Sequence, residues 1–228
     1  HDGDNGFVAV TGGQGSLDVT FNETSEKDLR EGEMQIGLPV ALIILVIVFG
    51  ALAAAGLPLA VAIVSIIIAL GVTALLGRAF ELSVFVVNVF TTIGLAVGID
   101  YSLLVVQRFR EERRKGLTVE DAIGRSGATA NKAVLFSGMA VIAALAGLII
   151  VPDSIFRSLG TGAIIVTVVA ILAATTLLPA ILKLMGDKVN AIHIGLPRRG
   201  MSDGEAGKFW TRTSAFVMKH AVLSLVVS

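Results

Sequence analysis

The sequence contains no cysteine and only three histidines among its 228 residues. The lack of cysteine excludes disulfide bonds and thiolate metal sites. The histidines, His1, His193 and His220, lie far apart in the chain, so the sequence shows no metal-binding set. We therefore expect no metal and no cofactor.

Charged residues are scarce as well. They make up 16% of the chain against 54% hydrophobic residues, and the formal net charge is zero. Soluble domains reach about 25% charged residues. No basic stretch alternates with aromatic residues, so we expect no nucleic-acid partner. The mean hydropathy of +0.85 favours an all-α polytopic membrane bundle, whose spanning helices are runs of roughly 20 apolar residues.

The apolar residues form five runs, which we predict as membrane spans at about 36–55, 59–76, 82–107, 133–151 and 159–184. Gly56-Leu57-Pro58 separates the first two runs and predicts a tight helical hairpin. Thr118, with Asp121 three residues later, predicts the start of a short helix that leads into the fourth span. Residues 185–214 are expected to form a linker and an amphipathic helix, and 215–228 the truncated start of another span.

Residues 1–35 differ from the rest of the chain because they are polar, glycine-rich and acidic. Two short strand patterns, Phe7–Thr11 and Leu17–Phe21, flank a glycine-rich turn. A segment of this length is too short to build its own core. We predict a short α/β remnant of a larger extramembrane domain.

Lysine and arginine cluster on one side of the predicted spans. The short loops on the other side hold only Arg78 and Arg157. The positive-inside rule places the basic segments in the cytoplasm and residues 1–35 outside. These segments carry Arg108, Arg110, Arg113, Arg114, Lys115, Arg125 and Lys132 after the third run, and Lys183, Lys188, Arg198, Arg199, Lys208, Arg212 and Lys219 after the fifth.

Asp100 lies in the middle of the third run, inside the segment Gly98-Ile99-Asp100-Tyr101. An isolated charge at that depth is costly, so an intramembrane aspartate is a functional candidate. On a helix, Gly94 and Gly98 lie about 120° and 160° away from it. That glycine pair would allow a neighbouring helix to pack closely on the other side. The face of Asp100 itself carries Ile93, Val97, Leu103, Leu104 and Gln107.

A low-dielectric surrounding disfavours the charged form of a carboxyl group, so we interpret Asp100 as a proton-binding switch, with Tyr101 beside it. The structural alternative is a hydrogen bond that fixes helix packing. An aspartyl protease would need a second carboxylate, but Glu81 and Asp153 lie at the outer edges of the spans. We therefore expect no enzyme.

Other polar residues within the spans are weaker candidates. Their simplest role is back-bonding to helical carbonyl groups, although Ser137 keeps a supporting role because it lies in the span after Asp100. The cluster Arg108–Lys115 is a topology determinant or a binding surface for anionic headgroups. The residues considered are Asn88, Thr91, Thr92, Ser137, Thr175 and Thr176.

The third run and its exit, GLAVGIDYSLLVVQRFREE, resemble the Asp-Tyr helix of the MMPL family of transporters in the resistance-nodulation-division superfamily. VFGALAAAGLPLA, AIGRSGATANKAVLFSG and ATTLLPAILKLMGDK agree with it, so the resemblance covers about 36–190. It implies that residues 1–35 end a periplasmic porter domain. It also implies that the five runs are helices two to six of twelve.

The resemblance further implies a function. Asp100 and Tyr101 would form half of a proton relay, and a second Asp-Tyr helix would lie in a C-terminal half outside this chain. The implied activity is export of lipids or other hydrophobic molecules across the bacterial inner membrane, driven by protons as the coupling ion. The alternative is a sterol-sensing-like or secretion-auxiliary module, which moves no lipid itself. A homo-oligomer is left open.

Overall fold

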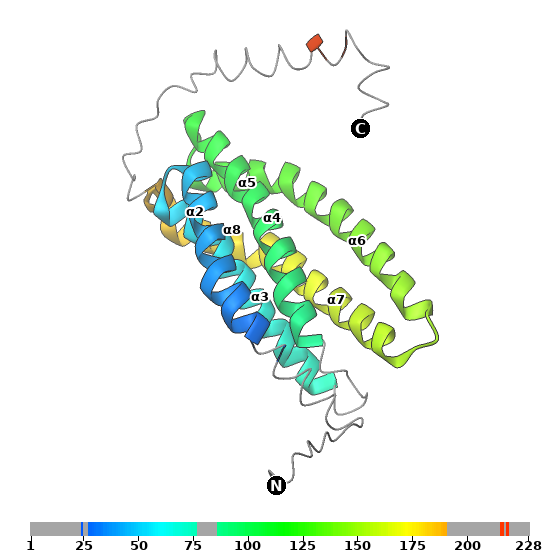
Figure 1. Cartoon of the computed structure of the whole chain (residues 1–228). Coiled ribbons are helices and arrows are strands. Elements are labelled where there is room, and N and C mark those ends of the chain that lie inside the picture. Colours follow the sequence, from blue (N-terminus) through cyan, green and yellow to red (C-terminus); the bar gives the residue numbers. More distant parts are fainter. Residues whose placement is uncertain (1–23, 25–26, 77–85, 191–214, 217, 219–228) are drawn as a thin grey trace, which may run out of the picture. The chain divides into compact units, whose positions relative to one another are not determined.

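The computed structural model describes residues 24, 27–76, 86–190, 215, 216 and 218, and it divides the chain into two units, 1–192 and 193–228. The elements named below belong to the first unit, and all of them are helical (Figure 1). They are η1 (Asp28–Gly37), α2 (Leu38–Phe49), α3 (Leu52–Leu76), α4 (Val86–Arg114), α5 (Val119–Ser126), η2 (Gly127–Asn131), α6 (Lys132–Ile150), α7 (Ser154–Leu172), η3 (Ala173–Leu177), α8 (Leu178–Met185) and η4 (Gly186–Asn190).

Within the described ranges, four helices are long and apolar enough to cross a membrane: Leu52–Leu75, Val86–Arg114, Val119–Ile150 and Ser154–Val189. Helices suit this environment because they satisfy their backbone hydrogen bonds internally. The first predicted span is a shorter apolar helix, Met34–Phe49. The helical membrane bundle is thus confirmed. The strands predicted for the N-terminal segment lie outside the described residues.

The turn predicted at Gly56-Leu57-Pro58 is wrong. These residues lie inside α3, and the chain turns earlier, at Gly50 and Ala51. Gly50 has a φ of 66°, the left-handed conformation that glycine adopts readily, and its N–H donates to the carbonyl of Val46 at 2.7 Å. Pro58 lacks an N–H and removes one hydrogen bond of α3, which a buried position in a membrane bundle tolerates.

The start of the helix leading to α6 agrees with the prediction. Thr118 has an extended backbone and its hydroxyl accepts a hydrogen bond from the N–H of Asp121 at 3.1 Å, which caps α5. The helix then continues through η2 into α6. The third predicted span, which was expected to end at Gln107, continues as α4 to Arg114.

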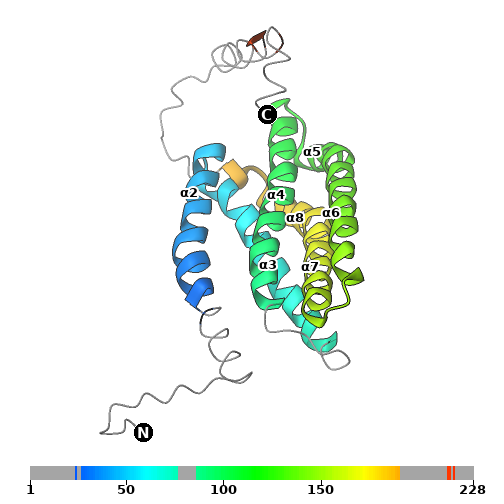
Figure 2. The ribbon, with the colours of Figure 1, turned by 45° about the vertical axis from the view of Figure 1, so that its right-hand side comes forward.

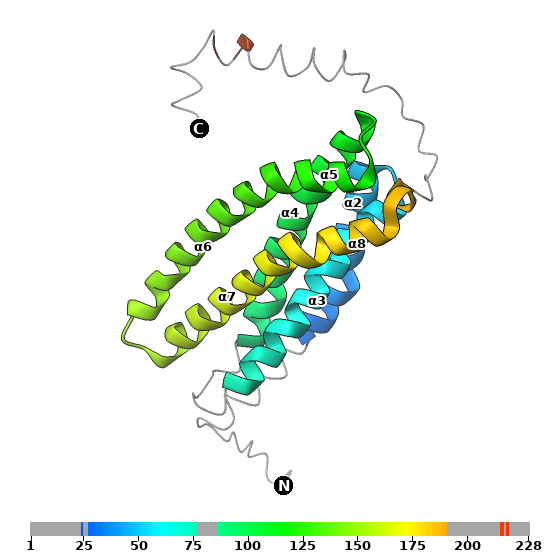
Figure 3. The same ribbon diagram turned by 180° about the vertical axis from the view of Figure 1, so that it is seen from behind.

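Helix α4 occupies the centre of the bundle. It packs against α3 and α7, and α6 packs along α7 at the periphery (Figures 2 and 3). The buried residues of α4 recur every three or four positions, as expected for one face of a helix. They are Val86, Phe90, Gly94, Gly98, Tyr101, Ser102, Val105, Val106, Phe109 and Arg110.

Two glycines of α4 permit this packing. A Cβ atom on Gly98 would lie 2.8 Å from the Cβ of Ala62 and 2.9 Å from its Cα, on the backbone of α3. A Cβ atom on Gly94 would lie 2.6 Å from Cγ1 of Ile66 and 2.9 Å from Cγ2 of Val166. All four distances are shorter than normal contacts, so a larger residue at either position would push α4 away from its neighbours α3 and α7.

We expect Gly98→Ala to destabilise the protein by about 1–3 kcal/mol, because the added methyl group overlaps the backbone of α3. Gly147→Ala is the matched control, since Gly147 lies in a helix and nothing is within 4 Å of its added Cβ. That control should be neutral or more stable by up to about 1 kcal/mol. The measurement is the fraction of monodisperse protein left after heating in detergent. Equal stability of both variants would contradict the close contact.

Candidate functional site

Asp100 lies in the middle of α4 and is exposed. Of the residues on its face, Ile93, Val97, Leu103 and Leu104 are half-buried and Gln107 is exposed. Among the residues that the structure describes, Asp100 makes no hydrogen bond and no ion pair. The carboxyl group therefore lies on an outward-facing, mainly apolar surface of the bundle.

Tyr101, the next residue, points in a different direction. It is only 7% exposed and belongs to the core. A Cβ atom on Gly138 of α6 would lie 3.4 Å from the Tyr101 hydroxyl oxygen, so this hydroxyl lies against α6. In the described part of the chain that hydroxyl has no hydrogen-bond partner. Within the residues that the structure describes, Asp100 and Tyr101 thus do not converge on one partner.

The other predicted site residues fall into two groups. Gly94 and Gly98 lie at the contact of α4 with α3 and α7, on the side of α4 away from Asp100. Ser137, Thr92 and Gln107 are exposed. No hydrogen bond joins Ser137 to Asp100 or Tyr101 in the described residues. Their supporting roles remain predictions.

Three of the threonines considered, Thr91, Thr175 and Thr176, bond to helical carbonyl groups, as predicted. The hydroxyl of Thr91 donates to the carbonyl of Asn88 at 3.0 Å, that of Thr175 to Ile171 at 2.8 Å, and that of Thr176 to Leu172 at 2.5 Å. Thr175 and Thr176 lie in η3, a π-helical segment just before Pro179. Proline cannot donate to the carbonyl four residues earlier, which accounts for the irregular helix there.

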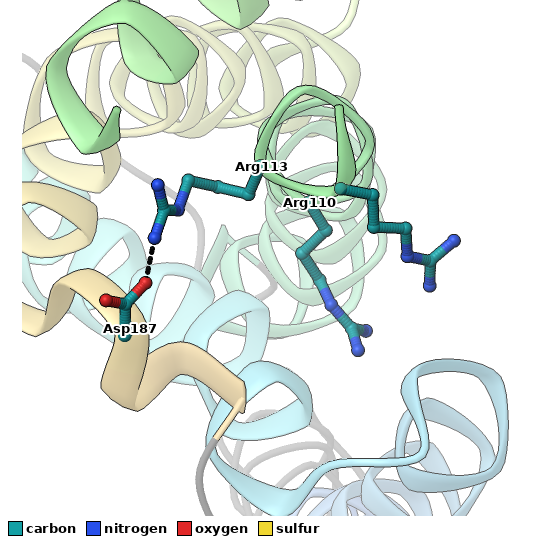
Figure 4. A pocket seen from close by; sticks show the side chains of 4 residues that line it. Arg110, Arg113 and Asp187 are labelled. Carbon is teal, nitrogen blue, oxygen red and sulfur yellow. Dashed lines mark hydrogen bonds and ion pairs between the residues drawn. The ribbon is translucent and has the colours of Figure 1, made fainter. Parts of the chain in front are cut away.

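The basic end of α4 has structural contacts that the sequence did not reveal. Arg110 is buried, its Nη1 donates to the carbonyl of Phe49 at 2.9 Å, and its guanidinium carbon lies 5.3 Å from the centre of the Phe49 ring. Arg113 donates to the carbonyl of Leu117 and pairs with the Asp187 carboxylate (Figure 4). These contacts join the end of α4 to the α2–α3 turn and to η4.

The sequence profile of the MMPL family matches residues 4–223. The chain belongs to the MMPL family. With its membrane-length helices, it is a multi-pass membrane protein of a transporter family.

Several MMPL relatives are similar over most of this chain. The mycolic acid-containing lipids exporter MmpL11 of Mycolicibacterium smegmatis is 36% identical over 95% of the chain and 22% of its own length. The trehalose monomycolate exporter MmpL3 of Mycobacterium tuberculosis is 34% identical over 84% of the chain and 20% of its own length. The heme uptake protein MmpL11 of M. tuberculosis is 38% identical over 91% of the chain and 21% of its own length.

This chain therefore spans about a fifth of the length of these MMPL relatives. Their names describe exporters and an uptake protein and mention no enzyme. The matched part contains the helices described above, including α4 with Asp100 and Tyr101.

Replacing Tyr101 by Phe should change the free energy of unfolding by less than about 0.5 kcal/mol, because the hydroxyl that is lost has no partner in the described residues. Tyr101→Ala should cost roughly 3 kcal/mol, because it leaves a cavity between α4 and α6. Unfolding of the purified protein in mixed micelles measures both effects. A loss above about 1.5 kcal/mol for Tyr101→Phe would mean that the hydroxyl is hydrogen-bonded.

Proposed function

We propose that this chain forms part of a transporter that exports lipids or other hydrophobic molecules across the bacterial inner membrane, driven by proton influx. The observation that carries the proposal is the exposed carboxyl group of Asp100 on an apolar face of a membrane-length helix. The exporter names of two MMPL relatives support the lipid class. A third relative is named as a heme uptake protein, so the proposed substrates include hydrophobic molecules other than lipids.

A lone charge inside a membrane is costly. Placing an aspartate at the centre of a membrane helix costs about 2.5–3.5 kcal/mol on insertion scales. Asp100 avoids this cost if it is protonated, or if protein or water covers it. We propose that a second Asp-Tyr helix in the rest of the transporter faces this surface of α4, so that Asp100 is charged when paired and neutral when released.

The cycle uses this change of charge. Asp100 takes a proton from the periplasmic side, loses its pairing and allows the spans to shift. Each proton that crosses the membrane supplies about 2.3 kcal/mol per 100 mV. The Tyr101 hydroxyl lies against α6, and Gly98 packs against Ala62 of α3. A displacement of α4 therefore also moves α3 and α6. The movement reaches the periplasmic porter domain through α2, and release of the proton to the cytoplasm resets the site.

The proposed orientation follows from charge. The basic end of α4 contacts the α2–α3 turn through Arg110 and Phe49, and it contacts η4 through Arg113 and Asp187. Excess lysine and arginine mark the cytoplasmic side of membrane proteins. We therefore propose that this end is cytoplasmic and that the α6–α7 turn, Val151–Asp153, is periplasmic.

The decisive test is Asp100→Asn in the whole transporter, reconstituted in vesicles with an imposed proton gradient and labelled lipid. Transport should be abolished while the yield of folded protein stays unchanged, since the amide preserves shape but binds no proton. Tyr101→Phe should reduce transport less, because only the hydroxyl is lost.

Asp153→Asn is the matched control. Asp153 accepts hydrogen bonds from the N–H groups of Ile155 and Phe156 at the start of α7, and Asn caps helices equally well. This variant loses the same charge and should transport at the wild-type rate. A wild-type rate for Asp100→Asn would contradict the relay. A wild-type protein that binds lipid but moves none under a gradient would favour the sensing or secretion-auxiliary module.

A further inference from the structure

We propose that the basic end of α4 binds the phosphate group of an anionic phospholipid. This inference goes beyond lipid export and does not depend on it. Two pockets adjoin there, and Arg110 and Arg114 line both. One has a volume of about 140 Å³ and is completed by Arg113 and Asp187 (Figure 4). The other has a volume of about 250 Å³ and is completed by Val48, Phe49, Gln107 and Glu111.

One positive charge in these pockets, that of Arg114, is not balanced by a carboxylate of the described residues. Both carboxylates are already paired: Asp187 with Arg113, and Glu111 with Arg108 at 2.8 Å. Arg114 is exposed and makes no hydrogen bond or ion pair among the described residues. A phosphate diester would therefore meet an unneutralised guanidinium group, whose planar set of donors matches phosphate oxygens.

Arg110 adds orientation to this site. Its guanidinium group is held by the carbonyl and the ring of Phe49, so it is ordered before any ligand arrives. Arg110 lines both pockets, so it places a fixed cation next to the exposed Arg114. An ordered donor loses little side-chain entropy when an anion binds.

The depth of the site selects a lipid as the ligand. From Val86 to Val106, α4 rises about 30 Å, which equals the hydrocarbon thickness of a typical bilayer. Gln107–Arg114 therefore lie at the level of the headgroups. On the membrane side, α2 exposes Ile44, Ile47 and Val48, and Val48 lines the larger pocket. An acyl chain can lie along these side chains while its phosphate contacts the arginines.

The test is native mass spectrometry of the whole transporter in detergent, titrated with phosphatidylglycerol or with phosphatidylcholine of the same acyl chains. Wild-type protein should bind phosphatidylglycerol more tightly. Arg114→Ala should weaken that binding about five-fold, the order expected for one basic residue near a membrane surface. Arg114→Lys should retain part of it. Size-exclusion chromatography confirms folding, which Arg114 does not support through any described hydrogen bond or ion pair.

Arg125→Ala is the matched control, because Arg125 is also exposed and basic but lies on α5 and lines neither pocket. It should bind phosphatidylglycerol like the wild type. Equal weakening in both variants would overturn the proposal, since the arginines would then act only through total charge. Soluble glycerol phosphate that binds as tightly as phosphatidylglycerol would also overturn it, because the site would then take free phosphate compounds.

Discussion

The close contact between α3 and α4 is the constraint on which the rest of the bundle depends. Without a hydrophobic driving force between helices in lipid, association relies on close packing, and small residues allow it. Gly98 meets the backbone of α3 at Ala62, and Gly94 fits between Ile66 and Val166. Once this side of α4 is buried, helix geometry turns Asp100, about 160° from Gly98, to the outside. The position of the carboxyl group is thus a consequence of where the glycines are.

Tyr101 connects the two sides of this helix. It follows Asp100 directly, yet its ring lies in the core and its hydroxyl lies against α6. A displacement of Asp100 on the outer face of α4 therefore also displaces Tyr101 in the core, because the two residues are adjacent in the backbone. At the other end of α4, Arg110 joins the helix to the α2–α3 turn. The helix that carries the carboxyl group is consequently fixed to its neighbours at the centre and at one end, which suits a part that transmits movement.

The apolar runs predicted the membrane-length helices, and the isolated carboxylate of Asp100 identified α4 as the helix of the candidate site. Both predictions succeed from the sequence because each depends only on the residues within one helix. The prediction of a turn at Gly56-Leu57-Pro58 was wrong for two reasons. Pro58 is buried within the continuous helix α3, and Gly50 supplies the left-handed residue of the turn that the chain makes instead. The end of α4 was placed too early because its charged last turns are good helix formers, with ion pairs such as Arg108–Glu111. The inward direction of Tyr101 and the contacts of Arg110 depend on neighbouring helices, which one sequence does not reveal. The predicted strands in 1–35 and the roles of Ser137, Thr92 and Gln107 stay predictions.

The most direct test of the central claim is infrared difference spectroscopy of the whole transporter in lipid, recorded between acidic and neutral pH. We expect a carbonyl stretching band of a protonated carboxyl group to appear reversibly on acidification. The band should be missing from Asp100→Asn and present in Asp153→Asn. Identical difference spectra for the wild type and Asp100→Asn would contradict the claim, because Asp100 would then exchange no proton.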